Sequence, residues 1–376
     1  MIFCLWEIIG VKGGEAVKQY CSSTNIISGA GAVAALKAFG AKRLLIVTDP
    51  YFYENRTAAR VAALSGAEQV EYFHRVAPDP TVELAAEGTA AVRRFQPDLL
   101  VALGGGSAMD CAKAMAYFSG SEAKFAAIPT TSGSGSEVTD FAILTHNGVK
   151  HPVVDKRLRP DTAILDSDLL ESMPQKLIAD AGFDVLCHAL EAFVAKGAGM
   201  ITDALAKEAF CTVYALLPAS YSGRTDVRLQ IHTAATMAGM AFTQAGLGLC
   251  HAMAHSLGGM FHLPHGRLNA MLLPAVIECN AHLAGDKYAR LAAAAGIGGS
   301  AQTMAVRNLK NALIRLRKEL GMPVTLAQAG IDPREVRMRS KELVDATLKD
   351  PCCGSNPIQV EDFMVRRVLE EVTGRA

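Results

Sequence analysis

The sequence predicts two parts of different character, an N-terminal α/β domain built on a parallel sheet and a C-terminal all-α domain. A chain of 376 residues is long for one domain, because domains typically hold about 100 to 150 residues. Between residues 27 and 165, short apolar runs alternate with Ala-rich segments of helical periodicity, which is typical of βαβ units. After Pro174, long segments with apolar residues at helical spacing take over. We place the boundary near residue 176, so that the domains cover residues 1–176 and 177–376.

Individual elements follow from the same patterns. The expected strands are short, apolar and bounded by Asp, Pro or Gly. They cover residues 44–48, 69–73, 99–103 and 125–128. The expected helices repeat apolar residues at helical spacing. They cover residues 175–197, 201–218, 226–243 and 302–320, and the loop around Ser172-Met173-Pro174 is the expected hinge.

Composition and charge exclude several classes of protein. The chain is 50% hydrophobic and 20% charged, which supplies a core and is unlike a disordered chain. Because 37 Lys and Arg balance 37 Asp and Glu, no overall positive field attracts nucleic acid or anionic lipid. The nine cysteines lack paired CxxC spacing, which favours a reducing compartment. The apolar start MIFCLWEIIG is too short to span a bilayer, so we expect a soluble cytoplasmic protein.

Two glycine-rich loops each follow an expected strand. The first contains Gly104, Gly105, Gly106 and Ser107. Glycines let backbone N–H groups approach a ligand, and the helix that follows offers a positive N-terminus to a pyrophosphate. A tight turn between strand and helix explains a lone glycine triplet equally well. The second loop, residues 128–137, adds two glycines and several hydroxyls, and two such loops on one sheet favour a bound nucleotide.

Asp49 ends the strand expected over residues 44–48. A carboxylate at this end of a strand accepts hydrogen bonds from a ribose diol and repels a 2′-phosphate, which would favour NAD over NADP. A helix N-cap before Pro50 is an equally good interpretation. In the usual dinucleotide fingerprint the glycines precede the acidic residue, whereas Asp49 precedes Gly104 by 55 residues. The sequence therefore predicts a sheet that differs from the ordinary Rossmann unit.

Histidines concentrate in one segment, and aspartate and histidine pair in another. Four of the ten histidines fall within 15 residues: His251, His255, His262 and His265. Upstream, Asp184 and His188 are four residues apart in an amphipathic segment, and His251 and His255 repeat this spacing. Residues at this spacing lie on the same face of a helix. One carboxylate with three imidazoles suits a divalent first-row metal ion.

For any single histidine, a hydrogen-bonded core residue is the more common explanation. Two helices that each present such a pair favour metal binding instead. A buried Asp184 without a partner is costly in free energy, and a metal ion relieves that cost. His262 is equally well a surface residue. The remaining histidines are interpreted as structural: His74, His146, His151, His232 and His282.

Several motifs, taken in order, resemble those of the iron-containing (group III) alcohol dehydrogenase family. They are LLIVTDP, GGGSAMDCAK, IPTTSGSGSEVTDFA, GVKHP, ESMP, AGFDVLCHALEA and CHAMAHSLGGMFHLPHGRLNA. The resemblance covers nearly the whole chain from about residue 26. It implies the dehydroquinate synthase-like fold of that family, in which an α/β dinucleotide-binding domain precedes an all-α metal-binding domain.

The resemblance also implies site residues. The implied metal ligands are Asp184, His188, His251 and His265. His255 matches a histidine near the nicotinamide and is the expected catalytic proton relay. The implied cofactor contacts are Asp49, Gly104, Gly105, Gly106, Ser107, Asp110, Thr130, Thr131, Ser134 and Lys150. The implied cofactors are NAD and Fe²⁺, with Zn²⁺ as an alternative because it binds such ligands more tightly.

Such a site would transfer a hydride between NAD(H) and a short primary alcohol or aldehyde, such as propanol and propanal or ethanol and ethanal. An alcohol proton is too basic to leave unaided at neutral pH, and coordination of the oxygen by a divalent ion overcomes this. The redox chemistry then belongs to the cofactor. Phe183, Phe242 and Phe261 are expected to line a pocket between the domains.

Three other functions remain open. A glycerol or polyol dehydrogenase of the same fold typically lacks one protein ligand, and a lyase acting on a sugar phosphate would need basic residues near the histidines. An inactive metal-binding scaffold would not need both glycine loops. Similarity to the propanol and ethanol dehydrogenases of bacterial microcompartments adds the expectation of a homo-oligomer inside such a compartment, with an aldehyde dehydrogenase or a shell protein as partner.

Overall fold

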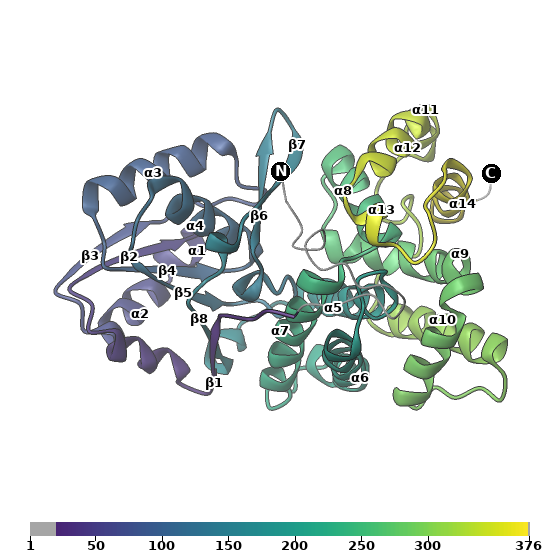
Figure 1. Ribbon diagram of the computed structural model, residues 1–376, viewed down its shortest axis with the longest axis horizontal. Helices are drawn as coiled ribbons and strands as arrows, with labels where there is room; N and C mark the ends of the chain where they lie inside the picture. Colours follow the sequence, from purple (N-terminus) through teal and green to yellow (C-terminus); the bar gives the residue numbers. More distant parts are fainter. Residues whose placement is uncertain (1–19, 375–376) are drawn as a thin grey trace, which may run out of the picture.

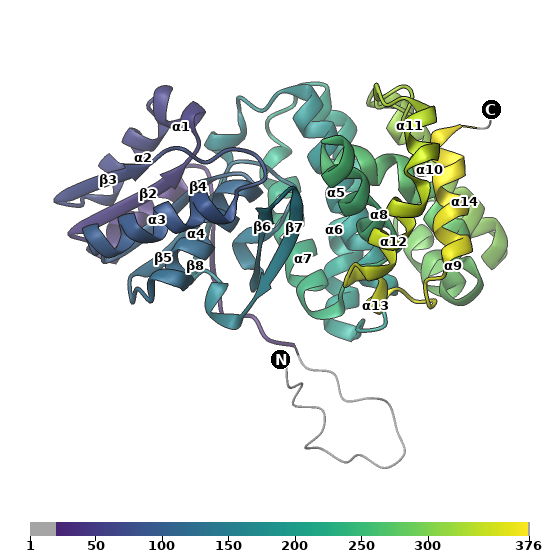
Figure 2. The same ribbon diagram turned by 90° about the horizontal axis from the view of Figure 1, so that it is seen from above.

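The structure, a computed structural model, describes residues 20–374, and the apolar start of the chain lies outside them. The chain forms a half built on a sheet and a half built from helices, which lie side by side along the long axis (Figures 1 and 2). The predicted fold class is confirmed, because a parallel sheet with helices is followed by a region that is almost entirely helical.

Six parallel strands make up the main sheet, in the order β1-β8-β5-β4-β2-β3. They are β1 (Asn25–Gly29), β2 (Arg43–Thr48), β3 (Gln69–Phe73), β4 (Leu99–Gly104), β5 (Lys124–Pro129) and β8 (Thr162–Asp166). Four of them contain the predicted runs, and β8 and β1 extend the sheet beyond β5.

Helices cover both faces of this sheet because its central strands are apolar on both sides. Leu45 of β2 belongs to the core formed with α3 and α4, whereas Leu44 faces the opposite core, formed with η2 and α2. Neighbouring residues of a strand point to opposite faces. The covering elements are the 3₁₀ helix η2 (Ala32–Phe39), α2 (Thr57–Ser65), α3 (Val82–Phe95) and α4 (Gly106–Ser119).

The strand order reverses its winding at the carboxyl ends of β2 and β4, the place where open α/β sheets have their ligand crevice. From β2 the chain passes to β3 on one side, and then crosses back to β4 on the other side. Ligands of open α/β sheets bind where the winding reverses in this way. Asp49 follows β2 and Gly105 follows β4, so both lie at this point. The acidic residue precedes the glycines in the chain because β2 precedes β4.

An antiparallel hairpin that was not predicted stands beside the sheet. It consists of β6 (Phe141–His146) and β7 (Val149–Val154). β6 packs on α4 of the sheet half, and β7 contacts α8 of the helical half. The hairpin therefore touches both halves of the molecule, and Figure 2 shows it between them.

The helical half is arranged around α5, which is packed by α6, α7 and α9. Predicted helices correspond to α5, α6, α7 and α10, whereas the 30-residue α9 was not predicted as one helix and contains Pro274. The helices are α5 (Gln175–Val194), α6 (Met200–Tyr221), α7 (Arg228–Ala245), α8 (Leu249–Phe261), α9 (His265–Ala294), α10 (Gln302–Glu319), α11 (Pro333–Met338), α12 (Ser340–Lys349), α13 (Cys352–Ser355) and α14 (Asp362–Thr373).

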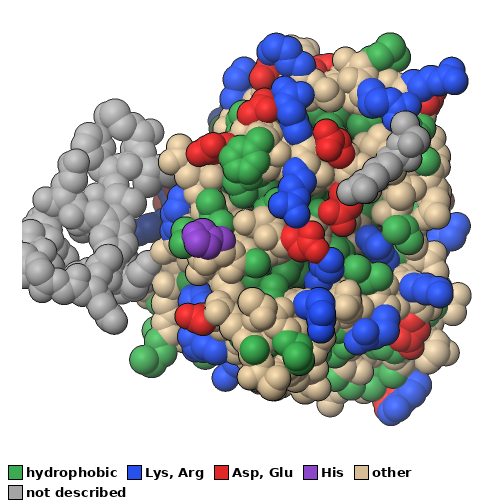
Figure 3. Space-filling model, turned by 90° about the vertical axis from the view of Figure 1, so that its right-hand side faces the viewer, with side chains coloured by type: hydrophobic (Ala, Val, Ile, Leu, Met, Phe, Trp, Pro, Cys, Tyr) green, Lys and Arg blue, Asp and Glu red, His purple; other side chains and the backbone are tan. Residues whose placement is uncertain are grey.

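The surface of the helical end carries charges of both signs. Basic and acidic side chains alternate with apolar ones on the face shown in Figure 3, in keeping with the balanced net charge. Within residues 20–374, no helix has the length and apolar character needed to cross a membrane.

Candidate active site

Helix α5 carries the first two residues of the predicted metal cluster. Its residues from Ile178 to Val194 are buried. Asp184 and His188 are four residues apart and therefore lie on the same face of the helix. This arrangement places a carboxylate and an imidazole deep in the protein, where polar groups need partners.

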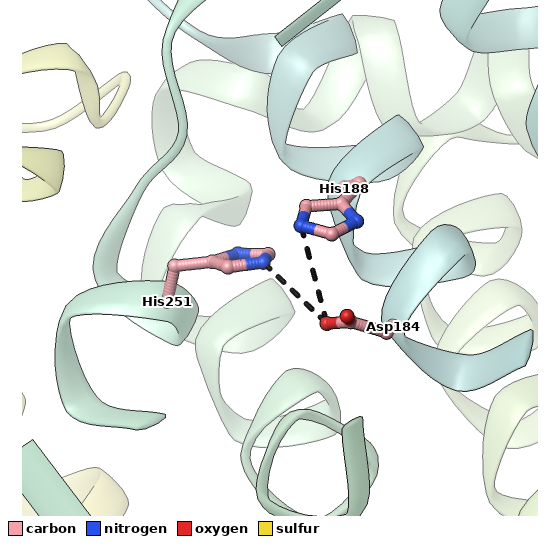
Figure 4. A group of neighbouring side chains, drawn as sticks. All are labelled: Asp184, His188 and His251. Carbon is pink, nitrogen blue, oxygen red and sulfur yellow. Dashed lines mark ion pairs between the residues drawn. The ribbon is translucent and has the colours of Figure 1, made fainter. Parts of the chain in front are cut away.

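Three imidazoles converge on one oxygen of Asp184. Its Oδ1 atom lies 4.0 Å from Nε2 of His188 and 3.8 Å from Nε2 of His251. Nε2 of His265, at the start of α9, lies 3.6 Å from the same oxygen. Figure 4 shows Asp184 and His188 on α5 facing His251, which comes from α8. The fold thus brings together all four residues that the motifs implied.

The geometry and chemistry of this cluster fit a divalent ion. The separations of 3.6 to 4.0 Å are too long for hydrogen bonds, so three ring nitrogens point at Asp184 without bonding to it. Ligand atoms about 2.1 Å from a shared ion lie roughly 3 to 3.5 Å from one another. The observed separations are only slightly longer than these. Imidazole nitrogens with a carboxylate suit iron or zinc.

Protonation states also suit a cation. Burial lowers the pKa of His188, His251 and His265, so these rings are neutral at neutral pH and can donate a lone pair. Burial acts to raise the pKa of Asp184, but the three histidines and the Asn269 amide outweigh it and hold that pKa below its usual value. The cluster therefore combines neutral rings with a charged carboxylate.

Glu191 orients His251 and caps the start of α8. Its carboxylate accepts hydrogen bonds from the N–H groups of Gly248 at 2.9 Å and Cys250 at 2.7 Å. These groups belong to the first turn of α8, where they have no partner within the helix. Glu191 Oε2 also lies 2.6 Å from Nδ1 of His251, which directs Nε2 towards Asp184. Burial raises the pKa of Glu191 to about 7, although the backbone N–H groups oppose this.

Asn269 supports Asp184 from α9. Its Nδ2 donates a hydrogen bond to Oδ1 of Asp184 at 2.7 Å. Asn269 follows His265 by four residues, so both face α5 from the same side of α9. Close packing of the two helices requires Gly266, because a Cβ there would lie 1.9 Å from the carbonyl oxygen of Asp180.

His255 lies beside the cluster and is held by Asp350. Its Nδ1 is 2.8 Å from Oδ2 of Asp350, and its ring stacks on that of His265 with the centroids 5.1 Å apart. The His255 side chain is 29% exposed, whereas that of His251 is 1% exposed. A histidine between a buried cluster and solvent is suited to carry protons.

Asp49 and the glycine triplet meet at the carboxyl ends of β2 and β4. The N-cap interpretation of Asp49 is confirmed, because its Oδ1 accepts a hydrogen bond from the N–H of Phe52 at 3.0 Å at the start of α1 (Pro50–Glu54). The other oxygen, Oδ2, lies beside the triplet, 3.7 Å from where a Cβ of Gly104 would stand. One carboxylate thus caps a helix and borders the crevice.

The two glycine loops pack against each other. A Cβ at Gly105 would lie 3.3 Å from Oγ1 of Thr131, and one at Gly106 would lie 3.1 Å from Oγ of Ser134. Larger residues in the triplet would therefore push the loops apart. The predicted cofactor residues that meet here are Asp49, Gly104, Gly105, Gly106, Ser107, Thr130, Thr131 and Ser134.

Asp110 and Lys150, the other two predicted cofactor residues, are bonded within the protein. Asp110 accepts hydrogen bonds from the Ser136 hydroxyl at 2.7 Å and the Ile143 N–H at 3.1 Å. Lys150, on β7, forms an ion pair of 2.7 Å with Asp79. Asp110 supports the second loop through Ser136, and direct contact of these two residues with a cofactor stays a prediction.

Lys113 ties α4 to the second loop and the hairpin. Its buried ammonium donates to the hydroxyls of Ser136 at 2.9 Å and Thr139 at 2.7 Å, and to the carbonyl of Phe141 at 2.9 Å. Burial lowers the pKa of Lys113 to about 8, against the opposing charge of Asp110. This lysine thus holds the two glycine loops in one arrangement.

The second loop also contacts α7 of the helical half. The Ser132 hydroxyl lies 3.0 Å from Nδ1 of His232, and the Thr236 hydroxyl donates to Glu137 at 2.6 Å. His232 is 1% exposed, as a structural histidine should be. Polar contacts therefore connect the second loop to α7, which packs against α5, the helix that carries Asp184 and His188.

Of the three aromatic residues expected to line a pocket, Phe242 contacts the cluster. Its ring stacks on His188 with the centroids 4.5 Å apart. Phe183 is buried in the core of the helical half, and Phe261, at the end of α8, lies beneath the guanidinium of Arg339. Phe242 is thus the apolar neighbour that the structure places at the histidines.

Sequence reasoning missed Glu191, Asn269 and Asp350. The sequence contained a signal for the first two. Glu191 lies on the same helix face as Asp184 and His188, and Asn269 follows His265 by four residues. Asp350 has no such signal, because it reaches His255 from 95 residues away.

Comparison with known proteins then defines the class. Residues 23–167 match the iron-containing alcohol dehydrogenase family, and residues 178–373 match the C-terminal part of the Fe-containing alcohol dehydrogenase family. The protein is therefore an oxidoreductase of the alcohol dehydrogenase type. It is 40% identical to a 1-propanol dehydrogenase of Salmonella typhimurium, over 95% of this chain and 100% of the relative. The chain belongs to the iron-containing alcohol dehydrogenase family, as its motifs indicated.

Two further relatives bear on the cofactor. An NADPH-dependent butanol dehydrogenase of Clostridium saccharobutylicum is 38% identical over 80% of this chain and 83% of its own length. The structure of a sulfoacetaldehyde reductase from Bifidobacterium kashiwanohense in complex with NAD⁺ has a TM-score of 0.86 and 26% identity. The match covers 96% of this chain and 100% of that one. Relatives of this chain thus include proteins described with either nicotinamide cofactor.

Proposed function

We propose that this protein transfers a hydride between NAD(H) and a short primary alcohol or aldehyde, using a divalent ion held by Asp184, His188, His251 and His265. The observation that carries this proposal is the convergence of three imidazole nitrogens on Oδ1 of Asp184. In this proposal residues 1–176 bind the nucleotide and residues 177–376 bind the ion.

Fe²⁺ is the ion that the family name indicates, and Zn²⁺ accepts the same donors. When bound, the ion would act as a Lewis acid on the substrate oxygen, which makes an alcohol proton easier to remove. The protein's own contribution is orientation. Glu191 directs Nε2 of His251, and Asn269 holds Asp184, so these ligands are placed in advance.

His255 is the residue to which we assign proton transfer. Asp350 holds its Nδ1, which leaves Nε2 free of that bond and able to accept a proton from the substrate side. Its partial exposure provides a route for that proton to solvent. The carboxylate of Asp350 also stabilises the ring when it carries the extra proton.

Asp49 supports NAD as the preferred cofactor, because a carboxylate beside the glycine triplet repels the 2′-phosphate of NADP. The NAD⁺ complex of the sulfoacetaldehyde reductase agrees with this choice, whereas the butanol dehydrogenase uses NADPH. The names of the propanol and butanol dehydrogenases support a short aliphatic substrate.

A glycerol or polyol dehydrogenase is the second candidate, but the apolar ring of Phe242 against His188 favours an aliphatic substrate. The motif resemblance further leads us to propose a cytoplasmic homo-oligomer inside a bacterial microcompartment. An aldehyde dehydrogenase or a shell protein would be its partner there.

Anaerobic reconstitution tests the proposed function. Metal-free protein is reloaded with one equivalent of Fe²⁺ or Zn²⁺, and NADH absorbance is followed with propanal, ethanal and glycerol added separately. We expect NADH consumption with the two aldehydes. His265→Ala should lose metal and turnover, whereas the exposed His262, three residues earlier at the end of α8, should tolerate His262→Asn. Metal-loaded protein that turns over none of these substrates would favour an inactive scaffold.

A further inference from the structure

Three side chains outside the first cluster bring ligand atoms together. A ring nitrogen of His255, a carboxylate oxygen of Asp350 and the sulfur of Cys352 all lie within 4.8 Å of one another. Asp350 follows the last residue of α12 and Cys352 begins α13, so the two lie on the turn between two helices that pack on α8. The Cys352 N–H donates to Oδ1 of Asp350 at 2.8 Å, and Oδ2 of the same carboxylate reaches His255.

This donor set differs from the first cluster by its sulfur. Nitrogen, oxygen and sulfur ligands bind zinc at about 2.0 to 2.3 Å, and three protein ligands leave a position for water. Thiolate favours soft cations, whereas the first cluster offers only nitrogen and oxygen. The second set is therefore expected to prefer zinc and cadmium over iron.

Charge and access also favour a cation here. A carboxylate and a thiolate together balance the two charges of a divalent ion, so the loaded site is neutral. Binding releases the thiol proton of Cys352 to solvent, and the Nδ1 proton of His255 moves to Nε2, so the bound ring can no longer accept a proton there. All three residues are partly exposed, as is His265 of the first cluster, whereas Asp184, His188 and His251 are buried. An ion can therefore reach the second set without entering the first.

We propose that His255, Asp350 and Cys352 form an inhibitory site for soft divalent cations of the zinc and cadmium class. Inhibition rests on the proposed function of His255, because an ion on Nδ1 replaces the bond to Asp350 and removes the ring from proton transfer. Metal binding itself does not depend on that function.

Cadmium titration of the iron-loaded protein under anaerobic conditions tests the site. A cadmium thiolate has an ultraviolet charge-transfer band, which reports binding without any turnover. We expect the band and the loss of ethanal reduction to rise together while the iron content stays constant. Cys352→Ser should keep basal turnover, lack the band and need about tenfold more cadmium or more for half inhibition.

Cys353→Ser is the matched control, because its sulfur bonds to the carbonyl of Thr347 at 3.1 Å and is not part of the proposed site. It should behave as the wild type. Cys352→Ala, which also lacks the thiolate, serves if the serine variant does not fold.

Two results would overturn the proposal. A band that persists in Cys352→Ser assigns the thiolate to another cysteine, such as Cys187 beside Glu191 and His251. Iron loss in step with inhibition places the cadmium in the first cluster. If the protein reduces no aldehyde at all, the proposed function fails, while the band and its loss in Cys352→Ser still decide the site.

Discussion

At the scale of single residues, the direction of the His251 ring and the position of the Asp184 carboxylate each depend on a neighbour. His251 presents Nε2 to Asp184 because Glu191 lies 2.6 Å from its Nδ1, and Asp184 is held by Asn269 at 2.7 Å. Such neighbours reduce the freedom that a ligand must lose when an ion binds. The cluster is therefore built from two layers of residues rather than one.

Glu191→Gln should lower the affinity for Fe²⁺ or Zn²⁺ by roughly 10- to 100-fold. The amide has a single acceptor oxygen, so it cannot satisfy the N–H groups of α8 and also orient His251. Competition against a chromophoric chelator measures this affinity. Glu208→Gln, on the exposed side of α6, is the control, and equal affinities in the two variants would contradict the orienting role.

Asp49→Gly should shift the ratio of kcat/KM for NADH and NADPH towards NADPH by about tenfold or more. The physical reason is the removal of the charge that repels a 2′-phosphate. Glycine is chosen because it replaces an N-cap aspartate at a cost of only a few tenths of a kcal/mol. Steady-state kinetics with both cofactors gives the ratio, and an unchanged ratio would refute the role assigned to this carboxylate.

At the scale of elements, the second glycine loop and α7 are in direct contact. A Cβ at Gly135 would lie 2.7 Å from the Cα of Gly239, so the two backbones touch. Ser132 and His232 add a buried polar contact at the same place. Displacement of α7 would therefore move the loop at the nucleotide crevice.

His232 should make the protein less stable as the pH decreases. Burial lowers its pKa from 6.5 to about 4, so between these values the unfolded chain binds more protons than the folded one, and stability is lost as the pH falls. The difference between the two pKa values corresponds to a loss of about 3 kcal/mol in the free energy of unfolding. Urea denaturation of the metal-loaded protein at several pH values measures it.

His232→Asn should flatten this pH dependence, because it removes the titrating ring. His282→Asn, at an exposed position of α9, should leave the dependence unchanged. If both variants show the same slope as the wild type, His232 is not the group responsible.

At the scale of the whole molecule, the cluster joins distant parts of the chain. Asp184 and His188 come from α5, His251 comes from α8 and His265 comes from α9. The unfolded chain does not hold these residues together, so an ion that binds them stabilises only the folded state.

Chelation should therefore lower the melting temperature of metal-loaded protein. At a free ion concentration of 100 times the Kd, the stabilisation that is lost amounts to about 2.7 kcal/mol. Differential scanning calorimetry with and without chelator measures the shift. His265→Ala should respond much less, and an equal response in that variant would show that the stabilising ion is bound elsewhere.

Local patterns in the sequence were enough to predict the two halves of the fold and the residues of the first cluster. The period of apolar residues depends on whether a segment is strand or helix, so β2 to β5 and α5 to α7 were found near their observed bounds. The four-residue spacing of Asp184 and His188 reveals a shared helix face before any tertiary contact is known. The hairpin β6–β7 was not predicted because β7 is largely exposed, and because the residues of β6 do not alternate between polar and apolar in the sequence, although buried Ala142 and Leu144 alternate with less buried neighbours.

Contacts between distant segments required the folded chain. The strand order that opens the crevice beside Asp49, the cap that Glu191 places on α8 and the bond between His255 and Asp350 each join elements far apart in sequence. Composition and periodicity describe which surface an element must bury, but the same apolar surface can pack against many partners. Which polar groups then meet depends on how all the elements pack together, and that is set by the burial and hydrogen bonding of the complete molecule.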